Sequence, residues 1–282
     1  MENKSLSFFI DNALQEDIGD GDHTSAACIP AGAHGKARLL VKEEGVLAGA
    51  GIAPLVFHKL DPEASFALYL KDGTWIRPGD VAFIVEGRIM ALLQAERTVL
   101  NIMQRMSGIA TATRRYAEKL KGLKTKILDT RKTTPGMRML EKEAVRIGGG
   151  VNHRMGLYDM ILIKDNHIDF AGGIREAIER SHRYLKDTGR HLKIEVEARS
   201  LQDVRTILAT GGVDRIMLDN FSPADTRTAV GMIANTLETE SSGGITLETI
   251  RDYAECGVDY ISVGSLTHHI DSLDLSLDAI DF

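Results

Sequence analysis

The sequence predicts an α/β protein in which a small α+β domain is followed by βα units that build a parallel sheet, open or closed into a barrel. Between residues 36 and 87, short β-like runs are separated by turn signals such as Asp72-Gly73. From about residue 124 onward, short β-rich runs alternate with amphipathic segments in repeats of roughly 20–35 residues, the size of a βα unit. Polar residues gather directly after each of these later runs, where a parallel barrel binds its ligand.

The first part is expected to open with a helix, because apolar residues recur at helical spacing over residues 5–15. Residues 16–25, rich in Gly and Asp, are predicted to form a loop. Residues 89–120 have a long helical pattern, with a break expected at Ser107-Gly108. The other predicted elements of this part are strands over residues 37–41, 66–70 and 81–87 and a helix over residues 52–60.

The second part is predicted to alternate strictly between strand and helix, which indicates parallel pairing. Its expected strands cover residues 124–129, 160–164, 193–198, 214–219 and 259–264. Its expected helices cover residues 170–186, 201–209, 223–237 and 247–256.

Composition favours a cytoplasmic enzyme or binding protein. A net charge of -6 and a pI near 5.9 argue against a general nucleic-acid binder, which is normally basic. Cys28 and Cys256 are the two cysteines, which fits a reducing compartment without a disulfide framework. The N-terminal apolar patch lacks the length and cleavage site of a signal peptide, and no apolar run approaches the roughly 20 residues of a membrane span.

Cations are concentrated in one stretch of this acidic chain. Residues 130–167 hold seven Lys or Arg and two His against four Asp or Glu. The stretch contains "TRKTTPG", "GGGVNHRMG" and "LIKDNH", which are predicted to be loops. We therefore expect these cations to bind a local anionic ligand of small size.

The polar residues after the predicted strands suggest that this ligand carries phosphate or carboxylate groups. Arg makes planar bidentate contacts to such groups, and Lys supplies a point charge. Glycine-rich turns at strand ends can offer backbone N–H groups to phosphate, and carboxylates can hold Mg²⁺ or accept hydrogen bonds from sugar hydroxyls. The strand-end residues are Thr130, Arg131, Lys132, Lys164, Asp165, Asn166, Glu197, Asp219, Asn220, Ser242, Gly243, Gly244, Gly264 and Ser265.

Each of these features has a plainer explanation. A lone Lys after a strand is more often solvated, a Gly-Gly pair is usually a turn, and His153 and His167 are more often structural hydrogen-bonding groups. His268-His269 is given no role, because adjacent histidines cannot easily share one metal ion. The sequence has no zinc-ligand spacing, no G-x-S-x-G and no P-loop motif.

The chain resembles the quinolinate phosphoribosyltransferase family, also called nicotinate-nucleotide pyrophosphorylase (carboxylating). The similar segments, in order, are "EDIGDGDHTS", "AERTVLNIMQRMSGIAT", "DTRKTTPGMRMLEKEAVRIGGGVNHRMGLYDMILIKDNHI", "IEVEA", "IMLDN", "SSGGIT" and "ISVGSLTH". The resemblance implies a small N-terminal α/β sandwich domain over residues 1–115 and an incomplete, open α/β barrel over residues 116–282, with the option that the C-terminal tail returns to the first domain. It also implies a dimer or higher homo-oligomer that uses Mg²⁺.

The reaction implied by the resemblance joins quinolinate to phosphoribosyl pyrophosphate (PRPP), giving nicotinate mononucleotide, pyrophosphate and CO₂ in NAD biosynthesis. Lys132, Lys164, Glu197 and Asp219 would be the catalytic residues, and Glu197 and Asp219 would hold Mg²⁺ together with PRPP and water. The residues implied at the quinolinate carboxylates are Arg97, reaching from a partner subunit, with Arg131, His153, Arg154 and Lys164. The residues implied at PRPP and its phosphates are Thr130, Lys132, Glu197, Asp219, Ser242, Gly243, Gly244, Val263, Gly264 and Ser265.

Two assignments stay open. The acid that serves PRPP and its metal could be Glu195 in place of Glu197, and the first phosphate contact could be Ser241 or Ser242. Three other functions also stay open. A relative from molybdenum-transport operons shares the fold and much of the motif set. A Schiff-base aldolase would use Lys164 as its nucleophile. A binding module would hold PRPP but release no pyrophosphate.

Overall fold

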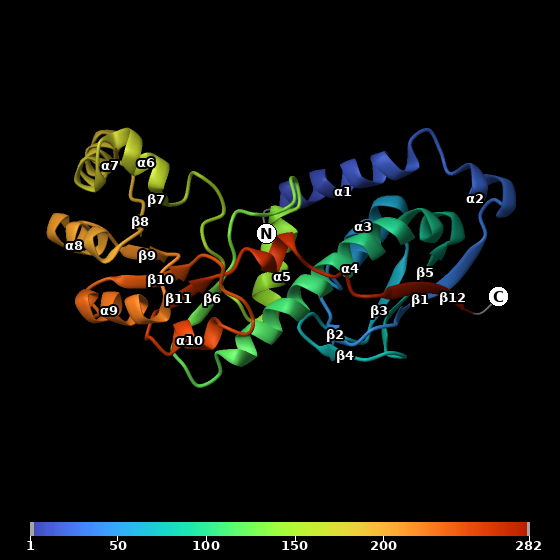
Figure 1. The fold of residues 1–282 in the computed structure, drawn as a ribbon. Coiled ribbons are helices and arrows are strands. Elements are labelled where there is room, and N and C mark those ends of the chain that lie inside the picture. The colour runs from blue at the N-terminus through green and yellow to red at the C-terminus, as the bar shows by residue number, and fades with distance from the viewer. Residues whose placement is uncertain (1–2, 281–282) are drawn as a thin grey trace. The chain divides into compact units, whose positions relative to one another are not determined.

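A computed structural model describes residues 3–280, which form two compact units (Figure 1). The first unit contains the described residues up to Arg114, together with residues 134–149 and the tail from His269 onward. The second unit contains residues 115–133 and 150–268. The change of unit after Arg114 lies next to the predicted boundary at 115/116, whereas residues 134–149 and the tail lie with the first unit.

The first unit is built on an antiparallel sheet with the strand order β12-β1-β5-β3, beside a small β2-β4 pair. Its strands are β1 (His34–Val41), β2 (Gly45–Val46), β3 (Ser65–Leu68), β4 (Trp75–Ile76), β5 (Val81–Arg88) and β12 (Leu275–Ile280). Its helices are α1 (Asn3–Ile18), α2 (His23–Cys28), α3 (Ala53–Leu60), α4 (Ile89–Lys119, whose last turn belongs to the second unit) and α5 (Arg138–Gly148).

The core of this unit follows from the alternation of apolar residues along its strands. Leu39 and Val41 of β1 and Phe83 of β5 are fully buried. The Phe83 ring lies 4.4 Å from the Phe66 ring and 6.3 Å from the Phe57 ring, centre to centre. The first helix and three strands of the predicted first part are therefore present, within a few residues of their predicted ends.

Two predictions for the first unit were wrong. α4 continues through Ser107-Gly108, because the glycine there allows close packing and does not break the helix. A Cβ atom on Gly108 would collide with the carbonyl oxygen of Asp271, so the C-terminal tail lies directly against the helix. The predicted loop over residues 16–25 is mostly helical, since α1 extends to Ile18 and α2 begins at His23 after an Asp22 cap.

The cation-rich stretch is also less loop-like than predicted, because it contains the helix α5. The buried Glu141 of α5 accepts a hydrogen bond from Arg105 Nε at 2.8 Å and one from the N–H of Thr134 at 3.2 Å. Gly148 packs so closely on α4 that a Cβ atom would lie 2.5 Å from the Ala110 carbonyl oxygen. These contacts place α5 in the first unit.

The second unit is a six-stranded parallel sheet in the order β6-β11-β10-β9-β8-β7. Within residues 3–280 the edge strands β6 and β7 do not pair with each other, so the predicted incomplete barrel is confirmed. Its strands are β6 (Lys126–Leu128), β7 (Ile161–Ile163), β8 (Ile194–Ala198), β9 (Arg215–Asp219), β10 (Glu238–Ser242) and β11 (Tyr260–Ser262). Its helices are α6 (Asp165–Ala171), α7 (Ile174–Thr188), α8 (Leu201–Thr210), α9 (Pro223–Ile233), α10 (Ile250–Ala254) and α11 (Ser265–His268).

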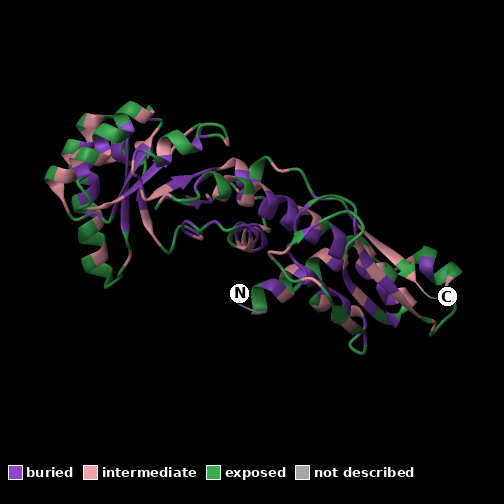
Figure 2. Cartoon of the chain, turned by 90° about the horizontal axis from the view of Figure 1, so that it is seen from below, coloured by how far each residue is buried: buried purple, intermediate pink, exposed green. Residues whose placement is uncertain are grey.

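The helices α7, α8 and α9 lie side by side along one side of this sheet (Figure 1). Figure 2 shows the strands of the sheet as mainly buried and the helices as exposed along their outer turns. This burial pattern is expected when amphipathic helices cover a parallel sheet.

Three predicted helices of the second unit have different bounds in the structure. The helix expected over residues 170–186 is two helices, since α6 ends at the left-handed Gly172 and α7 starts after Gly173. The helix expected over 223–237 stops at Ile233, and the one expected over 247–256 is only α10. No helix within residues 3–280 is long and apolar enough to cross a membrane.

Candidate active site

A cavity of about 780 Å³ opens in the second unit, where the parallel strands end. Most of the residues proposed from the sequence line it, although they come from six separate segments. The predicted residues on its wall are Thr130, Arg131, Lys132, His153, Arg154, Lys164, Asp219, Ser242, Gly243, Gly244, Val263, Gly264 and Ser265.

Strand periodicity explains which side chains reach this cavity. Met217 and Asp219 of β9 and Ser242 of β10 line it, while the intervening Leu218 does not. Alternate residues of a strand face opposite sides, so Met217 and Asp219 of "RIMLD" and Glu240 and Ser242 of "ETESS" face the cavity. The interior is therefore polar, although parallel barrels are usually filled with branched apolar side chains.

We call one part of the cavity the cationic end, formed by Arg131, His153, Arg154 and Lys164. Burial, followed by the charge of nearby Arg131, lowers the pKa of the Arg154 guanidinium below its usual value. Two guanidinium groups this close repel each other, and a bound anion would relieve that repulsion. The cationic end is thus suited to a ligand with more than one negative charge.

Lys164 is held at the rim of this end by a carboxylate. Its Nζ atom lies 3.3 Å from Glu197 Oε2, and Glu197 Oε1 accepts a hydrogen bond from the N–H of Asp165 at 3.3 Å. The Lys164 side chain remains 45% exposed, whereas that of Glu197 is 6% exposed. Lys164 can therefore reach a ligand while Glu197 fixes its direction.

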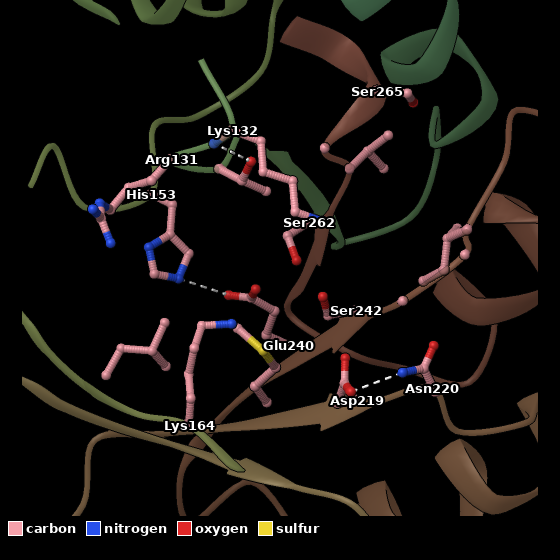
Figure 3. A pocket seen from close by; sticks show the side chains of 18 of the residues that line it. Arg131, Lys132, His153, Lys164, Asp219, Asn220, Glu240, Ser242, Ser262 and Ser265 are labelled. Carbon is pink, nitrogen blue, oxygen red and sulfur yellow. Dashed lines mark hydrogen bonds and ion pairs between the residues drawn. The ribbon is translucent and has the colours of Figure 1, made fainter. Parts of the chain in front are cut away.

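His153 is the most enclosed member of the group. Its Nε2 atom lies 2.9 Å from Glu195 Oε2 and 3.4 Å from Glu240 Oε2, and its Nδ1 atom accepts the N–H of Arg154 at 2.7 Å. Figure 3 shows the ring turned toward Glu240. Burial alone would lower the pKa of His153, but hydrogen bonds and charges from the two carboxylates outweigh it and raise that pKa to about 9.

Burial and the charge of Glu240 raise the pKa of Glu195 to about 7. The raised pKa values of His153 and Glu195 together indicate that this pair shares one proton at neutral pH. Because Nδ1 of His153 needs a lone pair to accept the Arg154 N–H, the contacts favour a ring protonated at Nε2, with the shared proton on Glu195.

The opposite part of the cavity, which we call the glycine end, contains Asp219, residues 242–244 and residues 263–265 (Figure 3). Asn220 Nδ2 donates to Asp219 Oδ2 at 2.8 Å, and the N–H of Asn220 donates to the Ser242 carbonyl at 2.9 Å. Gly243 has a φ of +95°, and a Cβ atom there would collide with Asn220 Oδ1. This end brings main-chain groups close to a ligand, as phosphate binding requires.

Lys132 belongs to the glycine end by position, although it follows Arg131 in the sequence. A Cβ atom on Gly264 would lie 3.0 Å from Lys132 Cδ. Thr267 Oγ1 donates to the Lys132 carbonyl at 2.8 Å, which fixes the main chain there. Adjacent residues Arg131 and Lys132 therefore serve different ends of the cavity.

The two predicted metal ligands have different environments. Asp219 presents a carboxylate to the cavity, and oxygen ligands of this kind suit a hard cation. Both oxygens of Glu197 already have partners, Lys164 and the Asp165 N–H, and Glu197 is absent from the described lining of the cavity. The donor set fits a cation at Asp219, while Glu197 would have to leave Lys164 to join it.

Arg97 lies on α4 in the first unit and is absent from the described lining of the barrel cavity. Its side chain is 57% exposed and lies 3.9 Å from Glu96 Oε1. It lines a different cavity of about 800 Å³, together with Phe8 of α1 and Met137. The role implied for Arg97 in a partner's site stays a prediction.

The two pairs of residues left open by the sequence occupy different environments in the structure. Glu195 is fully buried against His153, whereas Glu197 contacts Lys164. Ser242 lines the cavity, whereas Ser241 is buried and belongs to the opposite face of β10.

The sequence analysis missed several residues of the cavity wall. Glu240 and Ser262 lie within β10 and β11, and their alternation with outward-facing residues could have identified them. His268, which was given no role, lines the cavity from α11. Asn220, one of the predicted strand-end residues, also lines the cavity, and the other unpredicted lining residues are Leu162, Met217, Ile245 and Thr246.

One expectation about the cation-rich stretch was wrong. Arg138, Lys142 and Arg146 belong to α5 in the first unit and not to the cavity. Lys142 is fully buried, and Arg146 pairs with Glu143 at 2.5 Å. The excess of cations therefore has two causes, a ligand cavity and the packing of one helix.

Comparison with known proteins gives one consistent result. A family model described as quinolinate phosphoribosyl transferase, C-terminal domain, matches residues 109–278, and the corresponding N-terminal domain matches residues 22–107. A probable nicotinate-nucleotide pyrophosphorylase [carboxylating] of Bacillus subtilis is 45% identical over 99% of this chain and 94% of its own length. A chloroplastic nicotinate-nucleotide pyrophosphorylase [carboxylating] of Arabidopsis thaliana is 43% identical over 96% of this chain and 82% of its own length.

Solved structures agree with these relatives. The crystal structure of NadC from Streptococcus pyogenes has a TM-score of 0.93 and 38% identity, covering 100% of this chain and 99% of its own. The nicotinate-nucleotide pyrophosphorylase from Francisella tularensis has a TM-score of 0.92 and 37% identity, covering 99% of this chain and 98% of its own.

Proposed function

The chain belongs to the quinolinate phosphoribosyltransferase family, and we propose that the barrel cavity is the site where it joins quinolinate to PRPP. The enzyme is a pentosyltransferase of NAD biosynthesis. Its reaction gives nicotinate mononucleotide, pyrophosphate and CO₂. The names of the relatives favour this substrate over that of a molybdenum-operon protein and give no support to an aldolase.

The observation that carries the proposal is the division of one cavity into two chemically different ends. Quinolinate is a planar dicarboxylate, and Arg131, Arg154 and Lys164 supply the side-chain cations that such a molecule needs. PRPP carries a phosphate and a diphosphate, and the glycine end supplies backbone N–H groups together with Lys132. Each substrate has an end that suits its charge.

The residues then act by orientation and charge. Quinolinate held by its carboxylates presents its ring nitrogen toward the ribose carbon of PRPP, and attack there expels pyrophosphate. Lys132 stabilises the negative charge that grows on the leaving group. The ring nitrogen becomes positive and stabilises the carbanion left when the adjacent carboxylate departs as CO₂, and that carbon then takes up a proton from water to give the product. Because the substrates supply the reacting groups, a protein nucleophile is unnecessary.

Mg²⁺ is part of this proposal. Asp219 would hold it together with diphosphate oxygens and water, and Glu197 would contribute after releasing Lys164. Bound there, the ion would neutralise charge on the diphosphate. Asn220 would keep the Asp219 carboxylate directed into the cavity.

We also propose that the enzyme is a cytoplasmic homodimer, or a higher oligomer, with shared sites. Arg97 is exposed on the first unit, and a quinolinate pocket that gains one more cation would bind both carboxylates better. A two-fold axis would make such a contribution reciprocal.

The direct test mixes the purified protein with quinolinate, PRPP and Mg²⁺ and follows nicotinate mononucleotide and CO₂. We expect both products in equal amounts. Binding of PRPP without release of pyrophosphate on addition of quinolinate would contradict the proposal and indicate a binding module.

A further inference from the structure

The floor of the cavity holds three buried titratable side chains that are not assigned above to a substrate, gathered around His153. Glu195, Arg215 and Glu240 surround the Nε2 side of His153. Arg215 Nη1 lies 3.2 Å from Glu240 Oε2 and 3.9 Å from Glu195 Oε2. Both glutamate side chains are fully buried, and that of Arg215 is 9% exposed.

Strand register explains why these groups meet. Glu195 of β8 is paired in register with Arg215 of β9, and Glu240 of β10 is paired with Met217, two residues further along β9. All four positions face the barrel interior, because side chains alternate between the two faces of a strand. The cluster therefore replaces the apolar layer that a parallel barrel normally has at this depth.

Stability alone is a poor reason for such a cluster. Taking charges out of water is costly, and well-packed apolar side chains are often equally good or better at the same positions. The cluster touches the cavity through His153 and Glu240, which both line it. Burying this cluster costs free energy, and the cluster lies directly beneath a ligand cavity. We therefore ask which group of the cavity it holds in place.

The group held in place is His153. Its Nε2 faces the two carboxylates, and its Nδ1 accepts the main-chain N–H of Arg154. The main-chain N–H of His153 donates to Asp129 Oδ1 at 2.9 Å. Both ring nitrogens thus have partners within the protein. The ring fixes the main chain from which the Arg154 guanidinium enters the cationic end.

We propose that Glu195 and Glu240 are positioning residues of the quinolinate pocket, which act through His153, and that Arg215 neutralises them. This inference rests on the proposed function, since it deepens the description of the same pocket. His153 would then support Arg154 and bound quinolinate from below, with its ring nitrogens engaged by the protein.

The chain offers a matched control in Glu238. It lies two residues before Glu240 on β10 and pairs with the same Arg215, at 3.0 Å from Nη2. Its side chain is 35% exposed and also accepts from Tyr260 Oη at 3.2 Å. No ion pair joins Glu238 to His153 among the described residues. Glu238→Gln therefore perturbs Arg215 without touching the proposed support of His153.

The experiment measures KM for each substrate, and quinolinate affinity by calorimetry, on full-length Glu240→Gln, Glu195→Gln and Glu238→Gln. We expect the first two variants to weaken quinolinate binding roughly tenfold or more, as loss of a supporting partner commonly does. KM for PRPP should stay within about twofold of wild type in all three, and Glu238→Gln should stay within about twofold for both substrates, as expected for a partly exposed pair.

Coupling to His153 separates positioning from a merely structural role. In a His153→Ala background, adding Glu240→Gln should cause little further loss of quinolinate affinity, because the group that it supports is gone. Independent, multiplying effects would overturn the inference, as would equal changes in both substrates or an unchanged quinolinate KM. If either glutamate variant fails to fold, the other provides the same test.

Failure of the proposed function gives a different result. In that case the wild-type protein itself would neither bind quinolinate nor form nicotinate mononucleotide. A wild-type enzyme that does both, with a Glu240→Gln variant that binds quinolinate normally, would overturn only the positioning role.

Discussion

The two ends of the barrel cavity offer an anion different kinds of groups. The cationic end offers side chains that contact buried carboxylates, as Lys164 contacts Glu197 and His153 contacts Glu195. The glycine end offers the main chain of turns such as that at Gly243, where a Cβ atom would collide with Asn220. The comparison predicts that side-chain truncation disables the first end, whereas side-chain addition disables the second.

The largest effect is expected at Asp219, which supplies the carboxylate of the glycine end. Asp219→Asn should lower turnover by about two decades or more, because a preorganised charge contact at the reacting centre is lost. The same loss is expected when excess EDTA removes Mg²⁺ from the wild-type enzyme. Product formation is the readout, and Asp187→Asn, on the exposed side of α7, is the control. Full turnover in EDTA would refute the role of the metal.

Truncation at the cationic end should act on one substrate. Lys164→Ala and Arg154→Ala each remove a charge-assisted contact worth about 1.5–3 kcal/mol, so KM for quinolinate should rise by roughly one to two decades. KM for PRPP should change much less, and steady-state kinetics with each substrate varied measures both.

Arg146→Ala is the matched control for these two variants, because Arg146 comes from the same cation-rich stretch but pairs with Glu143 on α5. It should leave both KM values nearly unchanged. An effect of Lys164→Ala or Arg154→Ala confined to PRPP would mean that the two ends have been exchanged.

If the active site is shared between subunits, an arginine from the partner chain would add positive charge to the cationic end. If Arg97 serves the partner subunit, a dimer of one Arg97→Ala chain and one Lys164→Ala chain has one site with both defects and one intact site. Assayed at quinolinate well below the raised KM of the Lys164→Ala parent, purified mixed dimers should therefore regain about half of the wild-type activity, as two-fold symmetry requires. Mixed dimers that stay as inactive as each parent would show that Arg97 acts within its own chain.

The smallest effect is expected from adding a methyl group at the glycine end. Gly243→Ala meets Asn220 and a φ of +95°, which together cost about 1–3 kcal/mol. KM for PRPP should rise several-fold, while KM for quinolinate changes less. Gly244→Ala has a φ of +62° and open space around its Cβ, so its effect should be smaller. Equal effects of the two changes would mean that close main-chain approach at Gly243 is unimportant.

Local sequence patterns determined much of the fold. A β-rich pattern identified β5, and helical periodicity identified α4 and α8, because the core-facing residues of these elements are mainly apolar. The strand-end rule also predicts that Arg131, Lys164 and Asp219 meet at one cavity, and all three line it.

Long-range packing decided what the patterns could not. Ser107-Gly108 looks like a helix break, and only the approach of Asp271 shows that the glycine permits contact. Arg146 and Arg154 look alike in the sequence, but α5 carries the first into the other unit while the second enters the cavity. Glu240 looks like one residue of a polar segment until the sheet register sets it against His153.

Residue type and short spacing therefore predicted a parallel α/β sheet and most of the residues on the cavity wall, and the family resemblance added that the barrel is open. Which charges meet follows from tertiary packing. Whether Glu195 serves a ligand or supports His153 depends on strands that are distant in the chain and adjacent in the sheet. The role of a buried charged side chain depends on the groups that it contacts, and the order of residues in the chain does not give those contacts.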